Sequence, residues 1–100
     1  MLSIKYSRRA NADLEDITDY TARTWGAQQA KKYIREIKAK IQDVAKGDAI
    51  TQSLDGVEGK LFQVRASRHL IICEEKLGVL FVVRILHVSM DIPRHVSGSH

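Results

Sequence analysis

The sequence is poor in the residue types that mark secreted, membrane-spanning and disulfide-stabilised proteins. Its 100 residues include one cysteine, one proline and six glycines. No apolar run approaches the roughly 20 residues that cross a bilayer, and the chain does not open with the apolar core of a signal peptide, so we expect a cytoplasmic protein. Cys73 lies within an apolar run, which favours a buried packing residue over a nucleophile.

Motifs for metal, nucleotide and acyl chemistry are also absent. The histidines at positions 69, 87, 95 and 100 have no paired cysteines and no carboxylates at ligand spacing. There is no Gly-x-x-x-x-Gly-Lys loop to hold phosphates and no Gly-x-Ser-x-Gly elbow to present a nucleophile. The sequence therefore predicts no metal and no cofactor.

What the chain does contain is enough apolar sequence for one ordinary core, since 44% of its residues are hydrophobic. We expect one domain over residues 1–96, followed by a frayed polar tail at residues 97–100. The net charge of +4 is unevenly distributed. Residues 27–47 carry six basic and two acidic side chains, and residues 60–100 carry six basic and three acidic ones. This distribution suggests an acidic partner, either protein or nucleic acid, although a basic domain without such a partner is the simpler alternative.

The most apolar stretch is residues 79–87, where seven of nine residues are apolar and most are β-branched or aromatic. Such a run is typical of a strand buried on both faces. Two shorter runs of the same kind precede it at residues 61–65 and 69–73, and the glycine-containing segment 74–78 indicates a hairpin turn. These three runs predict an antiparallel meander whose last strand is the most buried.

A short strand and a helix are expected at the N-terminus. Apolar and polar residues alternate over residues 2–6, Ser7 is the expected helix N-cap with Asn11 as the alternative, and Gly26 ends the helix. Acidic residues over 13–19 are expected to suit the positive end of the helix dipole. This helix has an apolar stripe that consists of Ala10, Leu14, Ile17, Thr21 and Trp25. Because Trp25 fits the stripe, we expect it to pack between the helices rather than to line a groove for a partner.

A second amphipathic helix is predicted from about residue 27 to residue 46, ending at Gly47, with a basic outer face. Two apolar stripes that faced only each other would leave the sheet uncovered. We therefore expect an α+β domain with an N-terminal strand and an antiparallel helical hairpin packed on an antiparallel β-sheet. Residues 47–59 are expected to form a surface loop whose anchoring side chains are Ile50, Leu54 and Val57.

Arg84 and His87 are the candidate functional residues of the last strand. Strict alternation places Arg84 on one face with Val82 and Leu86, and His87 on the other. An arginine in so apolar a run is costly unless it is paired, so one interpretation is an ion pair with Asp91 or with an acid of the first helix.

The functional interpretation joins Arg84 and His87 to a basic surface of the sheet. Such a surface could hold phosphate and, with a histidine, cleave RNA by acid–base catalysis. No carboxylate is clearly placed beside His87, and no tyrosine stands in the sheet to assist it. The other basic members of this surface are Lys60, Arg65 and Arg68.

Two segments of the chain resemble ParE toxins. DLEDITDY at residues 13–20, followed by Trp25 and Gly26, resembles their helical hairpin, and VRILH at residues 83–87 resembles their terminal strand. The likeness extends over residues 2–96. It implies the toxin of a type II toxin–antitoxin system, within the ParE/RelE superfamily, built as a helical hairpin on a sheet.

The resemblance further implies that a ParD-like antitoxin protein wraps the toxin in a hetero-oligomer. The freed toxin is then expected to poison DNA gyrase without being an enzyme, without a membrane and without a need for direct nucleic-acid binding. The expected antitoxin contacts are Tyr20, Trp25, Tyr33 and Arg65. The expected target contacts are Arg84, His87, Asp91, Arg94 and His95.

RelE-like relatives provide the alternative function, because they cleave mRNA on the ribosome. Here the catalytic group would be Arg65, Arg84 and His87. Residues 72–74 (ICE) stand where many relatives carry an aromatic and a basic residue, which weighs against this alternative. A third possibility is a degenerate toxin that retains only antitoxin binding.

Overall fold

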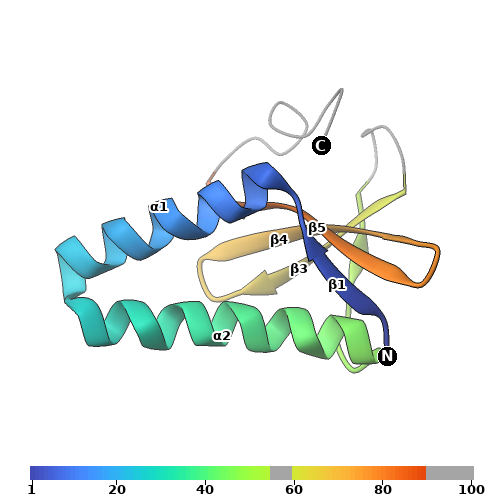
Figure 1. Cartoon of the computed structure of the whole chain (residues 1–100), viewed down its shortest axis with the longest axis horizontal. Helices are drawn as coiled ribbons and strands as arrows, with labels where there is room; N and C mark the ends of the chain where they lie inside the picture. The colour runs from blue at the N-terminus through green and yellow to red at the C-terminus, as the bar shows by residue number, and fades with distance from the viewer. Residues whose placement is uncertain (55–59, 90–100) are drawn as a thin grey trace.

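The computed structural model describes residues 1–54 and 60–89. Within these ranges two long helices lie on a five-stranded sheet of order β1-β5-β4-β3-β2 (Figure 1). This arrangement confirms the predicted α+β fold and the predicted helical hairpin. The elements are β1 (Ser3–Tyr6), α1 (Arg8–Trp25), α2 (Ala27–Lys46), β2 (Gln52–Ser53), β3 (Leu61–Ala66), β4 (His69–Lys76) and β5 (Val79–His87).

The sheet is mixed rather than wholly antiparallel. Strands β3, β4 and β5 form the predicted antiparallel meander. Strand β1 adds to β5 in the parallel direction, with Ser3 opposite Val79. Alternation over residues 2–6 predicts a strand but carries no information about its partner or direction, so the parallel pairing could not be read from the sequence.

The segment expected to be a surface loop contains the short strand β2, which pairs with β3. Of its three expected anchors, Leu54 packs against a buried cluster, whereas Ile50 is 95% exposed, so the prediction for Ile50 was wrong. Val57 lies outside the described residues.

The helix boundaries follow their predicted signals. The Ser7 hydroxyl accepts a hydrogen bond from the amide of Ala10 at 2.9 Å, which is the predicted N-cap of α1. Gly26 separates the helices at φ 97°, and Gly47 ends α2 in the left-handed conformation at φ 80°. The dipole expectation was wrong, because the first turn of α1 holds no acid and the effect fades beyond that turn.

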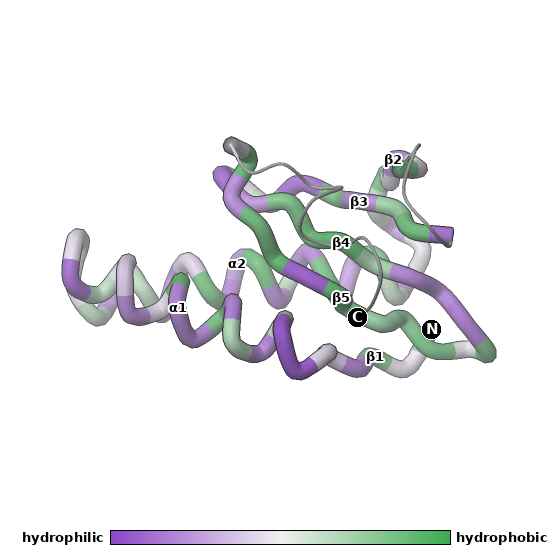
Figure 2. The backbone as a smooth tube through the Cα atoms, turned by 90° about the horizontal axis from the view of Figure 1, so that it is seen from above, coloured by the Kyte–Doolittle hydropathy of each residue, from purple (hydrophilic) through white to green (hydrophobic). Residues whose placement is uncertain are grey.

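Both faces of the sheet bury apolar side chains, as predicted for the last strand. The helix-facing cluster includes Ile37 and Ile41 of α2 together with Leu80 and Val82 of β5. Figure 2 shows this layering, with apolar sheet residues above the helices. A second buried cluster on the opposite face consists of Leu61, Ile72, Val83 and Leu86. The thiol of Cys73 lies in the helix-facing cluster, and burial raises its pKa to about 12, which confirms a packing role.

A β-bulge at Val83 breaks the alternation of β5. Cys73 pairs with Val82, but the preceding Ile72 pairs with Arg84, so Val83 is an extra residue on β5. Val82 therefore packs toward the helices while Leu86 packs on the opposite face. The prediction that Arg84 shares a face with both of them was wrong, because strict alternation does not allow for the inserted residue.

The tip of the helical hairpin projects beyond the sheet, as Figures 1 and 2 both show. The last turns of α1 and the first turns of α2 consequently have no strand beneath them. Trp25 is 67% exposed and Tyr20 is 63% exposed. The packing role preferred for Trp25 was therefore wrong, because the apolar stripe continues past the end of the surface that it covers.

Candidate functional site

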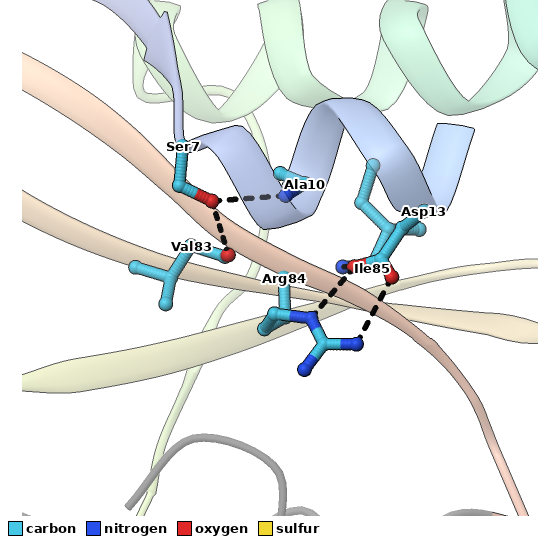
Figure 3. Close-up of polar contacts among 6 residues, drawn as sticks. All are labelled: Ser7, Ala10, Asp13, Val83, Arg84 and Ile85. Carbon is cyan, nitrogen blue, oxygen red and sulfur yellow. Dashed lines mark hydrogen bonds and ion pairs between the residues drawn. The ribbon is translucent and has the colours of Figure 1, made fainter. Parts of the chain in front are cut away.

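Beyond the last residue of β1, the first turns of helix α1 lie along β5 and contact it in place of a strand (Figure 3). The Ser7 hydroxyl donates to the carbonyl of Val83 at 2.6 Å, and the Asp13 carboxylate accepts from the amide of Ile85 at 2.9 Å. The same carboxylate accepts from Nε of Arg84 at 2.8 Å and from its Nη2 at 3.0 Å. We call this set of contacts the Asp13 seam.

The Asp13 seam confirms that Arg84 pairs with an acid of the first helix. The side chains of Arg84 and Asp13 are only 15% and 13% exposed, and the two-bond geometry is the stronger kind of arginine–carboxylate contact. Hydrogen bonding to Asp13 raises the pKa of Arg84 above its ordinary value, so the guanidinium stays charged. Arg84 therefore has a structural role at the junction of helix and sheet.

An open cleft of about 780 Å³ lies between the projecting hairpin and the turn that joins β3 to β4. It contains three of the four residues expected to bind an antitoxin, namely Tyr20, Trp25 and Tyr33. We call it the aromatic cleft. Its full lining is Asp16, Ile17, Tyr20, Thr21 and Trp25 of α1, Gln29, Tyr33 and Glu36 of α2, Ser67 and Arg68 of the turn, His69 of β4 and His87 of β5.

At the sheet side of the aromatic cleft, Tyr33, His69 and His87 form a contiguous group. The Tyr33 hydroxyl lies 2.6 Å from Nδ1 of His69, and the two imidazole rings meet edge to face with centroids 5.4 Å apart. Burial and the neighbouring His87 lower the pKa of His69, and Asp13 opposes them by raising it. In the sequence we looked for a tyrosine on the strands beside His87 and found none. The tyrosine of this group is Tyr33, which comes from helix α2.

The bulge in β5 brings the two histidines together. Counting from the Lys76–Val79 pair, a regular antiparallel ladder would place His69 opposite Leu86. The extra residue at Val83 shifts the register by one, so His69 pairs with His87 on the helix-facing side. The sequence signal for a bulge is weak, and for that reason this juxtaposition was not predicted.

Other predicted site residues lie elsewhere. Arg65 stands between Val64 and Ala66, which both pack toward the helices, so its side chain points to the opposite face. There its Nε donates to the carbonyl of Ser67 at 2.7 Å. The structure therefore does not bring Arg65, Arg84 and His87 together as a catalytic group. Asp91, Arg94 and His95 lie outside the described residues.

Across residues 1–54 and 60–89 no group of three metal-ligating side chains is found. In the same ranges neither helix is apolar enough over its length to cross a membrane.

The fold and the cleft define a small basic α+β domain with exposed aromatic side chains of the kind that protein-binding surfaces use. Comparison with known families identifies it further, because residues 4–92 match the family described as "ParE toxin of type II toxin-antitoxin system, parDE". The chain belongs to this family of toxins.

Individual relatives agree with the family match. The chain is 32% identical over 97 residues to Toxin ParE1 of Caulobacter vibrioides, with 96% of this chain and 99% of that protein covered. It is 34% identical over 84 residues to Toxin ParE of Escherichia coli, covering 83% and 82% of the two chains. A structure titled "Chromosomal ParDE TA system from P. aeruginosa" shares the fold, with a TM-score of 0.74 at 24% identity, covering 89% of this chain and 98% of that one.

Proposed function

We propose that this toxin is held inactive by a ParD-like antitoxin bound in the aromatic cleft, and that the released toxin inhibits DNA gyrase in the cytoplasm without catalysing a reaction itself. Membership of the ParE family supports both parts of the proposal. The observation that carries the antitoxin part is the exposure of Tyr20 and Trp25 at the projecting hairpin tip.

Exposed aromatic side chains beside a groove are typical anchors for a partner, because they bury a large apolar area at little cost in side-chain entropy. The floor of the cleft between the helices includes Ile17 and Thr21. An amphipathic helix laid between the hairpin and the β3–β4 turn would cover these aromatic and apolar surfaces together. The net charge of +4 favours an acidic antitoxin, which long-range attraction would steer toward the toxin.

Arg65 belongs to a second contact in this proposal. Its face of β3 carries a shallow depression lined by Gln52, Gln63 and Leu70. An antitoxin tail that continued past the β3–β4 turn could reach this face in an extended conformation. We assign the gyrase contact to His87, to Arg84 on the other face of β5, and to Asp91, Arg94 and His95 of the sequence that follows.

The decisive experiment is a supercoiling and cleavage assay with purified gyrase, plasmid and toxin, with and without antitoxin. We expect linear, protein-linked DNA to accumulate with the toxin and to disappear when antitoxin is added. No effect on gyrase would contradict the target, and cleavage of mRNA on ribosomes would then be measured.

The site assignments have separate tests. If Trp25→Ala and Tyr33→Ala leave antitoxin affinity unaltered in a titration, the cleft is not the antitoxin site. A chain truncated after Met90 should fold but lose its effect on gyrase. A folded truncation that still poisons cells would show that the assigned tail residues are not needed.

A further inference from the structure

His69 and His87 present a pair of hydrogen-bond donors whose orientation is fixed by the surrounding contacts. The amide of Arg68 donates to the Tyr33 hydroxyl oxygen at 3.2 Å. We therefore assign the hydroxyl proton of Tyr33 to the contact with Nδ1 of His69, 2.6 Å away, where the hydroxyl is the donor. A neutral imidazole that accepts at Nδ1 carries its proton on Nε2. The lowered pKa of His69 agrees with this neutral form.

The neighbouring Ser89 fixes the same tautomer in His87. The amide of Ser89 donates to Nδ1 of His87 at 3.3 Å, and the Ser89 hydroxyl lies 2.9 Å from the same nitrogen. Because Nδ1 is an acceptor, the ring proton of His87 is again on Nε2. Two imidazoles in edge-to-face contact therefore both carry Nε2–H donors.

These donors have no acceptor within the described part of the protein. Among the described residues the sole buried side-chain atom without a hydrogen-bond partner is Oε1 of Gln63, so Nε2 of His69, which has no partner there, is accessible to solvent. The Arg68 guanidinium, also without a described partner, lines the same cleft. Two N–H groups and a cation thus line one cleft without an oxygen to bind among the described residues.

Acidic side chains are present in the cleft, but on its other wall. Asp16 of α1 and Glu36 of α2 line the helix side and are exposed. They would repel an incoming anion from the hairpin and direct it toward the donors at the sheet. The wall between them is apolar and aromatic, so a suitable ligand carries one anionic group beside apolar ones.

We propose that His69, His87 and Arg68 form a carboxylate-binding site that takes one aspartate or glutamate side chain from the antitoxin segment bound in the aromatic cleft. This inference rests on the proposed antitoxin function and specifies its chemistry. It predicts an antitoxin helix with an acidic residue one turn away from its apolar anchors. Charge complementarity with the basic chain and the two N–H donors beside the Arg68 cation favour a carboxylate.

The site makes antitoxin binding depend on pH. A bound carboxylate favours the imidazolium form of His69, as Asp13 of α1 does, whereas burial and His87 oppose it. The other charged groups that face the site are Asp16 of α1, Glu36 of α2 and Arg68. Binding should therefore take up protons, and affinity should rise as the pH falls from about 7.5 to about 6.0. For each imidazole whose pKa the carboxylate raises by one unit, the gain approaches its limit of about tenfold only when the pH is below the pKa of the free toxin.

The first test compares two double variants in titrations with the co-encoded antitoxin. His69→Gln with His87→Gln keeps an N–H near each Nε2 but removes the titration, so affinity near pH 7.5 should change little and the pH dependence should vanish. His69→Phe with His87→Phe keeps the rings but removes the donors, so affinity should fall about tenfold or more at both pH values. Arg35→Gln on the exposed face of α2 is the control for loss of a charge. Phe variants that melt like the wild type and keep its affinity and pH dependence would overturn the proposal.

The second test needs no antitoxin. Imidazole NMR signals of the toxin alone are followed while sodium acetate is added, with sodium chloride as the control. We expect acetate to shift the signals of both histidines and to raise both pKa values, and expect the ¹⁵N shifts before addition to report Nε2–H forms. Absence of any acetate-specific shift, or a response to phosphate alone, would refute the carboxylate site. An antitoxin that fails to bind the wild-type toxin would contradict the proposed function, while the acetate titration would still decide the site.

Discussion

The two ends of helix α1 meet the sheet in opposite ways. Its first half is tied to β5 through the Asp13 seam, where nearly every polar group has a partner and the ionic pair is about 85% covered. Its second half leaves the sheet and exposes Tyr20 and Trp25 beside donors for which residues 1–54 and 60–89 provide no acceptor. The same amphipathic helix thus provides a structural junction at one end and the proposed antitoxin surface at the other.

The contrast teaches that residue type alone does not assign function in this fold. Arg84 is an arginine in an apolar strand and draws attention as a candidate functional residue, yet its guanidinium is paired with Asp13. Trp25 fits an apolar stripe and draws attention as a core residue, yet it is exposed. In each case the outcome depends on where the sheet begins and ends beneath the helix.

The strongest disturbance of the seam is Asp13→Ala. It would leave the Arg84 charge and the Ile85 amide without their acceptor, and we expect the free energy of unfolding to fall by about 2–4 kcal/mol. Glu15→Ala, at an exposed position of the same helix, should cost less than about 0.5 kcal/mol. Denaturant titration measures both, and equal losses would show that the seam contributes little.

At the other end of the helix, Trp25→Ala should separate binding from folding. Because Trp25 is 67% exposed, its removal should change stability by less than about 0.5 kcal/mol. We expect antitoxin affinity to fall by about 2 kcal/mol, roughly 30-fold. Leu77→Ala is the matched control, since Leu77 is an apolar residue with 92% exposure at the remote β4–β5 turn. Equal effects of the two changes in a calorimetric titration would contradict the assignment.

Ser7→Ala tests the point where strand β1 becomes helix α1. The change removes the N-cap of α1 and the bond to the Val83 carbonyl, and we expect a loss of about 1 kcal/mol in unfolding free energy. Ser3→Ala on the exposed face of β1 serves as its control. Thermal melts of the two variants should differ, and coincident melts would argue against the cap.

The smallest expected effect is the contribution of His69, in the aromatic cleft, to the pH dependence of stability. The folded-state pKa of His69 is lowered, so the unfolded chain binds its proton more readily. The contribution of His69 to stability is therefore complete above the ordinary histidine pKa of about 6.5 and is lost as the pH falls through the lowered value. His69→Gln should flatten the difference between unfolding midpoints at pH 7.5 and pH 5.5. An unchanged difference would assign that acid sensitivity to other groups.

Local signals in the sequence were sufficient for both helices and for every described strand except β2. Ser7, Gly26 and Gly47 mark helix boundaries through short-range backbone chemistry, and those boundaries were predicted correctly. The unpredicted features depend on contacts between distant parts of the chain. The parallel partner of β1, the bulge at Val83 and the Tyr33–His69 bond are set by packing, for which a single sequence has no periodic pattern.

The grouping of residues in the aromatic cleft was predicted in part for the same reason. Tyr20, Trp25 and Tyr33 were grouped as antitoxin contacts, and the structure does gather them in one cleft. His69 was noted but not joined to them, because its pairing with His87 depends on the bulge. Arg65 was included among the predicted antitoxin contacts because of its charge. Charge does not reveal the face of the sheet to which a strand residue points.

The pairing of β1 with β5 also affects the time at which the protein can fold during synthesis. Ser7 and Val83, whose hydrogen bond joins the start of α1 to the middle of β5, are 76 residues apart in a chain of 100. Contacts this distant form only after most of the polypeptide has left the ribosome. A nascent chain can build the helical hairpin early, but it completes the sheet, and with it the paired histidines, only after β5 has left the ribosome.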